Sequence, residues 1–139
     1  MKGAYILIAR LARPTTLTVG GLGEIGLQAG EYAYVGSAMG GLRQRIARHL
    51  RASKRRHWHI DYLLAVADGV EPFVWQDAAM SECELHQRLP PGEVAVAGFG
   101  ASDCRCRSHL AYFPRRPEID LIPWNRFRQL PEAGSAHKS

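Results

Sequence analysis

Cysteine is scarce in this sequence, and long apolar runs are missing from it. Three cysteines among 139 residues are too few for the disulfide framework that stabilises small secreted domains. No apolar stretch reaches the roughly 20 residues of a transmembrane helix. The first such stretch is interrupted by Arg10 and Arg13, unlike a secretory signal peptide. We therefore expect a protein of the reducing cytoplasm that has no membrane partner.

Acidic residues are missing from one long segment of the chain. Residues 43–56 include seven Lys or Arg side chains and no Asp or Glu, in a chain of formal net charge +5. Clustered positive charge of this kind favours nucleic acid as the partner, although a helix face exposed only to water has the same composition. The predicted phosphate contacts are Arg43, Arg48, Arg51, Lys54, Arg55 and Arg56.

The first part of the chain has the composition of an antiparallel sheet. Residues 4–9 are almost all apolar, which is typical of a buried strand. Residues 15–19 and 25–28 flank a glycine-rich turn and predict a hairpin, and residues 32–35 predict a further strand. With the helices that follow, these segments predict the α/β (α+β) class, as a small, mainly antiparallel sheet flanked by helices.

Apolar residues at helical spacing follow this sheet. Leu42, Ile46 and Leu50 recur every four residues and predict the apolar face of a basic helix over residues 42–51. The other expected elements are helices over 57–67 and 81–89 and strands over 72–76, 94–99 and 110–113.

The length favours one domain, which we place over residues 1–130, followed by a disordered tail over 131–139. Two aromatic residues near the end of the domain, Trp124 and Phe127, are expected to pack either on the domain itself or on a second copy of the chain. The sequence therefore leaves the oligomeric state open.

Four short motifs lie in order along these predicted elements. Gly3-Ala4-Tyr5 and Tyr34-Val35-Gly36 lie on strands, Leu42-Arg43-Gln44-Arg45 opens the basic helix, and Ser81-Glu82-Cys83-Glu84-Leu85 lies on a later helix. In this order they resemble the GIY-YIG endonuclease superfamily over residues 3–89. The longer strings YVGSAMGGLRQRIARHL, HWHIDYLL, ECEL and GASDCRCRSHL are similar to its divergent Uri-like branch of uncertain function, and this closer resemblance covers nearly the whole chain to Phe113.

The chain departs from the pattern of that superfamily in and between the first two motifs. Ala4 and Val35 stand where the pattern has isoleucine, and both suit a strand. Residues 15–30 lengthen the connection between the two motif strands, and we expect them to form an inserted hairpin. If this insertion bent the first strand away, Tyr5 would no longer face Tyr34.

The resemblance implies a role for four residues. Three of them lie in the first three motifs, and the fourth lies on the helix that the third motif opens. Tyr5 would act as the general base or orient the attacking water, and Tyr34 would line the cleft and bond to the phosphate or to Tyr5. Arg45 would hold the scissile phosphate through its fork of donors. His49, one helical turn later, would be a second phosphate contact or a proton carrier.

The resemblance also implies a metal ligand on the later helix. Glu82 would bind a single Mg²⁺ or Mn²⁺ ion, which supplies Lewis acidity to phosphodiester hydrolysis. Glu84 is the alternative ligand, although it also fits a capping box with Ser81. Because Glu82 and Glu84 are two residues apart, they do not share a helix face.

Each of these residues also has a plain structural interpretation. Tyr5 and Tyr34 suit a core as aromatic strand residues, and Arg45 suits a helix surface. Glu82 suits the first turn of a helix, where the helix dipole favours negative charge. The nuclease interpretation depends on the order in which the four occur.

Two histidines and an aspartate form a second set of polar residues. His57 and Asp61 are four apart and share a helix face, whereas His59 points elsewhere. We therefore predict a helix start with Trp58 and Ile60 buried in preference to a metal site, and His59 or Asp61 remains within reach of the cleft.

A third set contains the three cysteines. Cys104, Cys106 and His109, with Cys83 as a fourth ligand, have the chemistry of a structural zinc site. The C-x-C spacing is tighter than the usual one for zinc, and the alternative is that the cysteines are reduced, partly buried thiols.

Together these observations predict a metal-dependent endonuclease that hydrolyses phosphodiester bonds in nucleic acid, DNA more than RNA. No segment is suited to reading base edges, so we expect structure-selective or single-strand cutting in DNA repair or processing. One alternative is a nucleic-acid-binding module on the same fold that has no catalytic activity. Another is a zinc-stabilised interaction domain whose partner is a protein.

Overall fold

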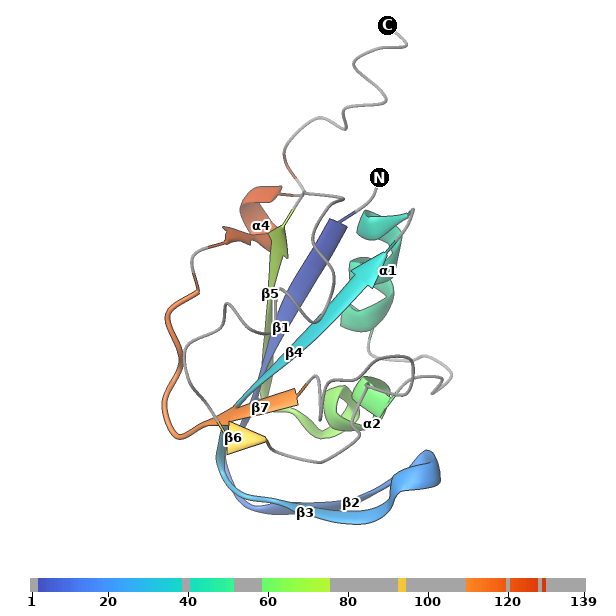
Figure 1. Cartoon of the computed structure of the whole chain (residues 1–139), viewed down its shortest axis with the longest axis vertical. Helices are drawn as coiled ribbons and strands as arrows, with labels where there is room; N and C mark the ends of the chain where they lie inside the picture. The colour runs from blue at the N-terminus through green and yellow to red at the C-terminus, as the bar shows by residue number, and fades with distance from the viewer. Residues whose placement is uncertain are drawn as a thin grey trace, which may run out of the picture.

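The computed structural model describes residues 3–38, 41–51, 59–75, 93–94, 110–119, 121–127 and 129. They form a mixed α+β fold around a six-stranded antiparallel sheet in the order β6-β7-β4-β1-β5-β8 (Figure 1). The predicted fold class is therefore confirmed. The strands are β1 (Gly3–Leu11), β4 (Gly30–Ala38), β5 (Gly69–Trp75), β6 (Glu93–Val94), β7 (Leu110–Phe113) and β8 (Ile122–Pro123). The helices are α1 (Leu42–Leu50), α2 (His59–Val66) and α4 (Trp124–Phe127).

Strand β1 lies between β4 and β5 and is buried on both faces. Its odd-numbered residues from Tyr5 to Leu11 pack in one core, and its even-numbered residues from Ala4 to Ile8 pack in another. A strand that is covered on both faces has apolar residues throughout and no polar alternation. This explains the apolar run over residues 4–9 and confirms the buried strand predicted from it.

The predicted hairpin between the two motif strands is also present. Its strands pair with each other in a separate two-stranded sheet, which contacts α2 and lies at one end of the main sheet (Figure 1). Strands β1 and β4 nevertheless pair without interruption from Gly3 and Ala38 to Leu11 and Gly30. The insertion therefore leaves the first strand in place. The hairpin consists of β2 (Thr15–Val19), the short 3₁₀ turn η1 (Gly20–Leu22) and β3 (Gly23–Leu27).

Two tyrosines fix the point at which the hairpin rejoins the main sheet. The hydroxyl of Tyr32 donates to the Gln28 carbonyl at 2.6 Å, and that of Tyr112 donates to the Ala29 carbonyl at 2.7 Å. Gly30 has a φ of +148°, and a Cβ there would lie 2.5 Å from Cε1 of Tyr112, so this position requires glycine. Burial raises the pKa of Tyr32 to about 12; Tyr112 adds to the rise and the hydrogen bond to Gln28 opposes it.

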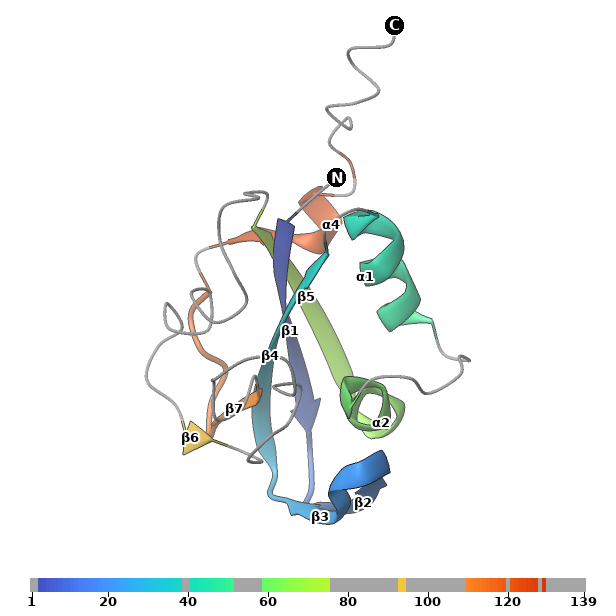
Figure 2. The same cartoon turned by 45° about the vertical axis from the view of Figure 1, so that its right-hand side comes forward.

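Helices α1 and α2 cover one face of the main sheet (Figure 2). Helix α1 buries Leu42 and Ile46 as predicted, but its third buried residue is His49, and Leu50 is 39% exposed. At about 100° per residue, the seventh residue after Leu42 lies closer to its face than the eighth does. The prediction was therefore wrong at this last position, because helix geometry and the polar partners of His49 outweigh the apolarity of Leu50.

Helix α2 and the aromatic residues of α4 complete this core. Helix α2 buries Ile60, as predicted, and ends just before Asp68, whose carboxylate accepts a hydrogen bond from the Ala12 amide at 2.7 Å. Trp124 and Phe127 pack in the same core cluster as the odd-numbered residues of β1. The first of their two expected placements, on the domain itself, is therefore the one observed.

Several predicted elements lie outside the described residues. They are the helix over 81–89, all but the first residue of the strand over 94–99, the last residue of the strand over 72–76 and the tail over 131–139. The first two residues of the helix over 57–67 also lie outside them, and with these the predicted burial of Trp58. In the part of the chain that the structure does describe, no helix combines the length and the apolarity needed to cross a membrane.

Candidate active site

The two motif tyrosines lie on adjacent strands and on the same face of the main sheet. In the register of β1 and β4, Tyr5 pairs with Gly36, and Leu7 pairs with Tyr34. Residues two apart on a strand share a face, so Tyr5 and Tyr34 are diagonal neighbours. Both belong to the core cluster that α1 and α2 cover, where Tyr5 is 2% exposed and Tyr34 is 7% exposed.

The glycine of the second motif makes room for the tyrosine of the first. A Cβ added to Gly36 would lie 2.4 Å from Cζ and 2.5 Å from the hydroxyl oxygen of Tyr5. Contacts below about 3 Å do not occur for real Cβ atoms, so any larger residue would displace the phenol ring. The two motifs are therefore joined in space, because one supplies the ring and the other supplies the surface under it.

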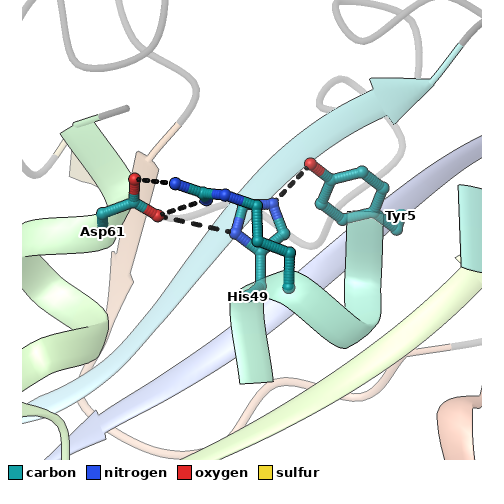
Figure 3. A network of polar contacts seen from close by, with 4 residues as sticks. Tyr5, His49 and Asp61 are labelled. Carbon is teal, nitrogen blue, oxygen red and sulfur yellow. Dashed lines mark hydrogen bonds and ion pairs between the residues drawn. The ribbon is translucent and has the colours of Figure 1, made fainter. Parts of the chain in front are cut away.

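The phenol of Tyr5 contacts a histidine of α1. Its hydroxyl oxygen lies 2.8 Å from Nε2 of His49, and the ring centroids are 5.4 Å apart with an interplanar angle of 50°. Figure 3 shows the Tyr5 hydroxyl directed at the imidazole. His49 is itself only 2% exposed. The imidazole either accepts the phenol proton or donates its own, according to which ring nitrogen is protonated.

A buried carboxylate of α2 lies on the other side of this imidazole. Oδ1 of Asp61 is 3.8 Å from Nδ1 of His49 (Figure 3), and Asp61 is 1% exposed. Both carboxylate oxygens of Asp61 also accept hydrogen bonds from the guanidinium of Arg48, at 3.0 and 3.1 Å. The chain of contacts therefore runs from Arg48 through Asp61 and His49 to Tyr5, and it ties two helices to the central strand.

The arginines predicted to contact phosphate differ in their surroundings. Arg48 is held in the bidentate pair with Asp61, and the guanidinium of Arg43 lies 4.6 Å from the centre of the Phe127 ring. Arg45 is half-buried, and Arg51 is exposed at the end of α1. The remaining basic residues of the predicted surface, Lys54, Arg55 and Arg56, lie outside the described residues.

The predicted metal ligands also fall outside the part of the chain with described coordinates. This applies to Glu82 and its alternative Glu84, and to the zinc set of Cys83, Cys104, Cys106 and His109. The described residues themselves contain no group of three His, Cys, Asp or Glu side chains that would hold a metal ion. Of the second polar set, Asp61 contributes to the network around His49.

The sequence did not predict that Asp61 faces His49 or that Arg48 pairs with Asp61. Asp61 lies twelve residues after His49 on a different helix, and no periodicity relates positions on separate elements. One signal was available: His49 is the seventh residue after Leu42, which places a polar side chain on the buried face of α1. A histidine in that position needs a polar partner in the core.

Comparison with known protein families matches residues 4–130 to a domain of unknown function, DUF123. The corresponding comparisons with curated proteins and with solved structures gave no match.

Proposed function

This chain belongs to the family described as domain of unknown function DUF123, and from that premise we propose that it is a metal-dependent endonuclease of the GIY-YIG type, in the Uri-like branch. The proposed reaction is phosphodiester hydrolysis in nucleic acid, DNA in preference to RNA. The observation that carries the proposal is the hydrogen bond between Tyr5 and His49 above Gly36. This arrangement brings the tyrosine of the first motif, the glycine of the second motif and the helix that the third motif opens to one place on the sheet.

The proposed first step moves a proton from Tyr5 to His49. A tyrosine with a pKa of about 10 is a poor base at neutral pH because its oxygen carries a proton. The transfer breaks the Tyr5 O–H bond and forms an Nε2–H bond on His49, which leaves a phenolate and an imidazolium. The 2.8 Å separation of these two atoms supports this step.

The phenolate of Tyr5 then acts as the general base. It takes a proton from a water molecule as the oxygen of that water bonds to phosphorus and the bond from phosphorus to the leaving oxygen breaks. The leaving oxygen takes a proton from solvent, to which His49 returns its own. Arg45, one helical turn before His49, would hold the nonbridging oxygens while negative charge develops on them.

The proposed metal ligand is Glu82. A Mg²⁺ or Mn²⁺ ion bound there would stabilise charge on the phosphate and on the leaving oxygen. The phosphate backbone would run along the basic helix and the residues that follow it, which gives affinity without sequence readout. Because such a surface binds the backbone without reading the bases, the proposed activity is structure-selective or single-strand cutting in DNA repair or processing. The proposed compartment is the cytoplasm.

The experiment is a nicking assay on supercoiled plasmid, single-stranded DNA and branched DNA, with Mg²⁺ and with EDTA. We expect cutting that needs the metal and is abolished in Tyr5→Phe and Glu82→Ala, whereas both variants still bind DNA in a fluorescence anisotropy titration. Tyr112→Phe is the matched control, because it also removes a tyrosine hydroxyl from the main sheet, a part-buried one that donates to the Ala29 carbonyl. Cutting that survives Tyr5→Phe at the wild-type rate contradicts the proposal.

One observation favours the alternative of a nucleic-acid-binding module without catalytic activity. Tyr5 and His49 are each 2% exposed, so a phosphate reaches them only if covering residues move. This module would bind DNA with the same salt dependence and cut none of the three substrates. Binding without cutting, in the presence of Mg²⁺ or Mn²⁺, would establish it.

A further inference from the structure

The buried carboxylate of Asp61 lies between a guanidinium and an imidazole, and each contact has a separate consequence. We infer that Asp61 is a positioning residue, which keeps the proton of neutral His49 on Nδ1 and so leaves Nε2 to accept the hydroxyl proton of Tyr5. The contribution of Asp61 to catalysis rests on the proposed function, whereas its effect on the protonation of His49 does not.

Arg48 holds Asp61 in its charged form. The two oxygens of Asp61 accept two hydrogen bonds from the planar fork of Arg48, at 3.0 and 3.1 Å. A guanidinium is always charged in proteins, and a bidentate pair favours the ionised form of the carboxylate. Asp61 is therefore a negative charge inside the protein, where a low dielectric strengthens its effect on nearby groups.

The two ring nitrogens of His49 have different neighbours. Oδ1 of Asp61 lies 3.8 Å from Nδ1, and the Tyr5 oxygen lies 2.8 Å from Nε2 (Figure 3). A carboxylate attracts the positive end of an N–H bond and repels a nitrogen lone pair, so it favours the tautomer with the proton on Nδ1. Nε2 then presents its lone pair to Tyr5, which donates the hydrogen bond.

The imidazolium that forms when His49 takes the Tyr5 proton also faces Asp61. The carboxylate lies on its Nδ1 side, and His49 is 2% exposed, so solvent contributes little to its stabilisation. Arg48 holds the carboxylate of Asp61 but adds a positive charge of its own, which lies farther out and is 20% exposed. The arrangement favours proton transfer towards His49 as long as Asp61 remains charged.

A purely structural role for Asp61 has a different signature. In that role the Arg48–Asp61 pair only holds α1 against α2. An apolar pair of similar volume should then serve equally well, because replacing a buried ion pair with apolar residues often leaves stability unchanged. In the positioning role the same replacement leaves the fold intact and removes the charge that faces Nδ1. The double variant Arg48→Met with Asp61→Leu therefore separates the two roles.

The test measures the nitrogen-15 shifts of the His49 ring, which distinguish the two tautomers, in protein labelled at histidine and assigned with His49→Gln. We expect the Nδ1–H form in the wild type and a shift towards the Nε2–H form in the double variant and, more weakly, in Asp61→Asn. In single-turnover nicking at saturating DNA, the double variant should retain its melting temperature within a few degrees and cut roughly 10- to 100-fold more slowly.

The matched control is Glu71→Gln. It also converts an ion-paired carboxylate to an amide, but Glu71 pairs with Arg116 at 2.7 Å, is exposed and lies on β5 away from His49. It should leave both the His49 shifts and the rate unchanged. Wild-type shifts in a folded double variant would overturn the inference, even if Tyr5→Phe abolishes cutting. If the His49 shifts change in the double variant but the wild-type protein cuts no DNA, the effect of Asp61 on the tautomer would stand. Its catalytic role and the proposed function would then both be rejected.

Discussion

The hydroxyl of Tyr5 on the central strand lies 2.8 Å from Nε2 of His49 on the first helix, 44 residues later in the chain. The contact is buried on both sides, since each residue is 2% exposed. Removing either partner should destabilise the folded protein, because the remaining buried group loses its hydrogen bond and gains none with water. Substitutions at either residue, or at the glycine beneath Tyr5, therefore test the site most directly.

Replacing Gly36 with alanine should displace Tyr5. The new Cβ would lie 2.4 Å from Cζ of Tyr5, and overpacking of this kind costs roughly 1–3 kcal/mol of unfolding free energy. Urea unfolding measures the destabilisation, and the ring shifts of His49 report whether the hydrogen bond to Tyr5 survives. Gly26→Ala is the control, because a Cβ at Gly26 meets nothing within 4 Å. Equal stability of the two variants would show that the ring of Tyr5 moves aside without cost.

Truncating His49 should cost far more stability than truncating Leu50. His49→Ala leaves a cavity and removes the partner of Tyr5, so we expect a destabilisation of roughly 2–3 kcal/mol. Leu50 is 39% exposed, and Leu50→Ala should cost less than about 1 kcal/mol. Thermal or urea unfolding of the two variants measures the difference. If Leu50→Ala were the less stable variant, the apolar face predicted from the sequence would be supported instead.

Alkaline pH should destabilise the fold through Tyr32. The pKa of Tyr32 is about 12 in the folded protein and about 10 in an unfolded chain. The unfolded state therefore releases its proton first, and stability falls as pH rises from about 10 through 12, by at most roughly 2–3 kcal/mol. Below about pH 10 this contribution is fully present.

Tyr32→Phe isolates this effect from the other titrating groups. It removes the hydrogen bond to Gln28, so near pH 8 the variant should be less stable by about 1 kcal/mol. Urea unfolding at a series of pH values should show this difference shrink and then reverse between about pH 10 and 12. A difference that stays constant over this range would contradict the raised pKa of Tyr32.

Removing the charges after α1 should weaken nucleic-acid binding and flatten its salt dependence. With Lys54, Arg55 and Arg56 replaced by alanine, the log–log slope of affinity against salt should fall by roughly 0.9 for each duplex phosphate that the protein no longer neutralises. Fluorescence anisotropy over a salt series measures the slope. An unchanged slope would mean that these side chains do not bind the phosphate backbone.

Replacing Arg45 should affect rate more than affinity. In the proposed site Arg45 holds the phosphate as charge develops, so Arg45→Ala removes an interaction that is strongest in the transition state. We expect kcat to fall by roughly 100-fold or more, with a DNA affinity within a few-fold of the wild type. A loss of affinity with kcat unchanged would assign Arg45 to binding alone.

Much of the sheet followed from the sequence because its signals are local. The apolar run over residues 4–9, the glycine-rich turn of the hairpin and the strand at 110–113 each depend on a few adjacent residues. The two motif tyrosines can be neighbours only if the insertion leaves β1 paired with β4, and the two strands do pair without interruption.

The environment of His49 did not follow from the sequence, for a physical reason. Leucine is more apolar than histidine, so a ranking by hydrophobicity places Leu50 in the core in preference to His49. The observed choice depends on Tyr5 and Asp61, which come from a strand and a helix far away in the chain. Such partners are determined by packing, and no window along the sequence contains them.

The pairing of β1 with β4 also separates the base of the inserted hairpin from the Tyr5 hydroxyl. The hairpin leaves at Leu11 and returns at Gly30, and Tyr5 lies six residues away along β1, which corresponds to roughly 20 Å. Within the hairpin, Glu24 and Gly26 of β3 are exposed, and a Cβ at Gly26 meets nothing within 4 Å, so this strand is a suitable point for attaching a fluorophore. A reporter carried there would follow the protein on its substrate while the phenol and its imidazole remain undisturbed.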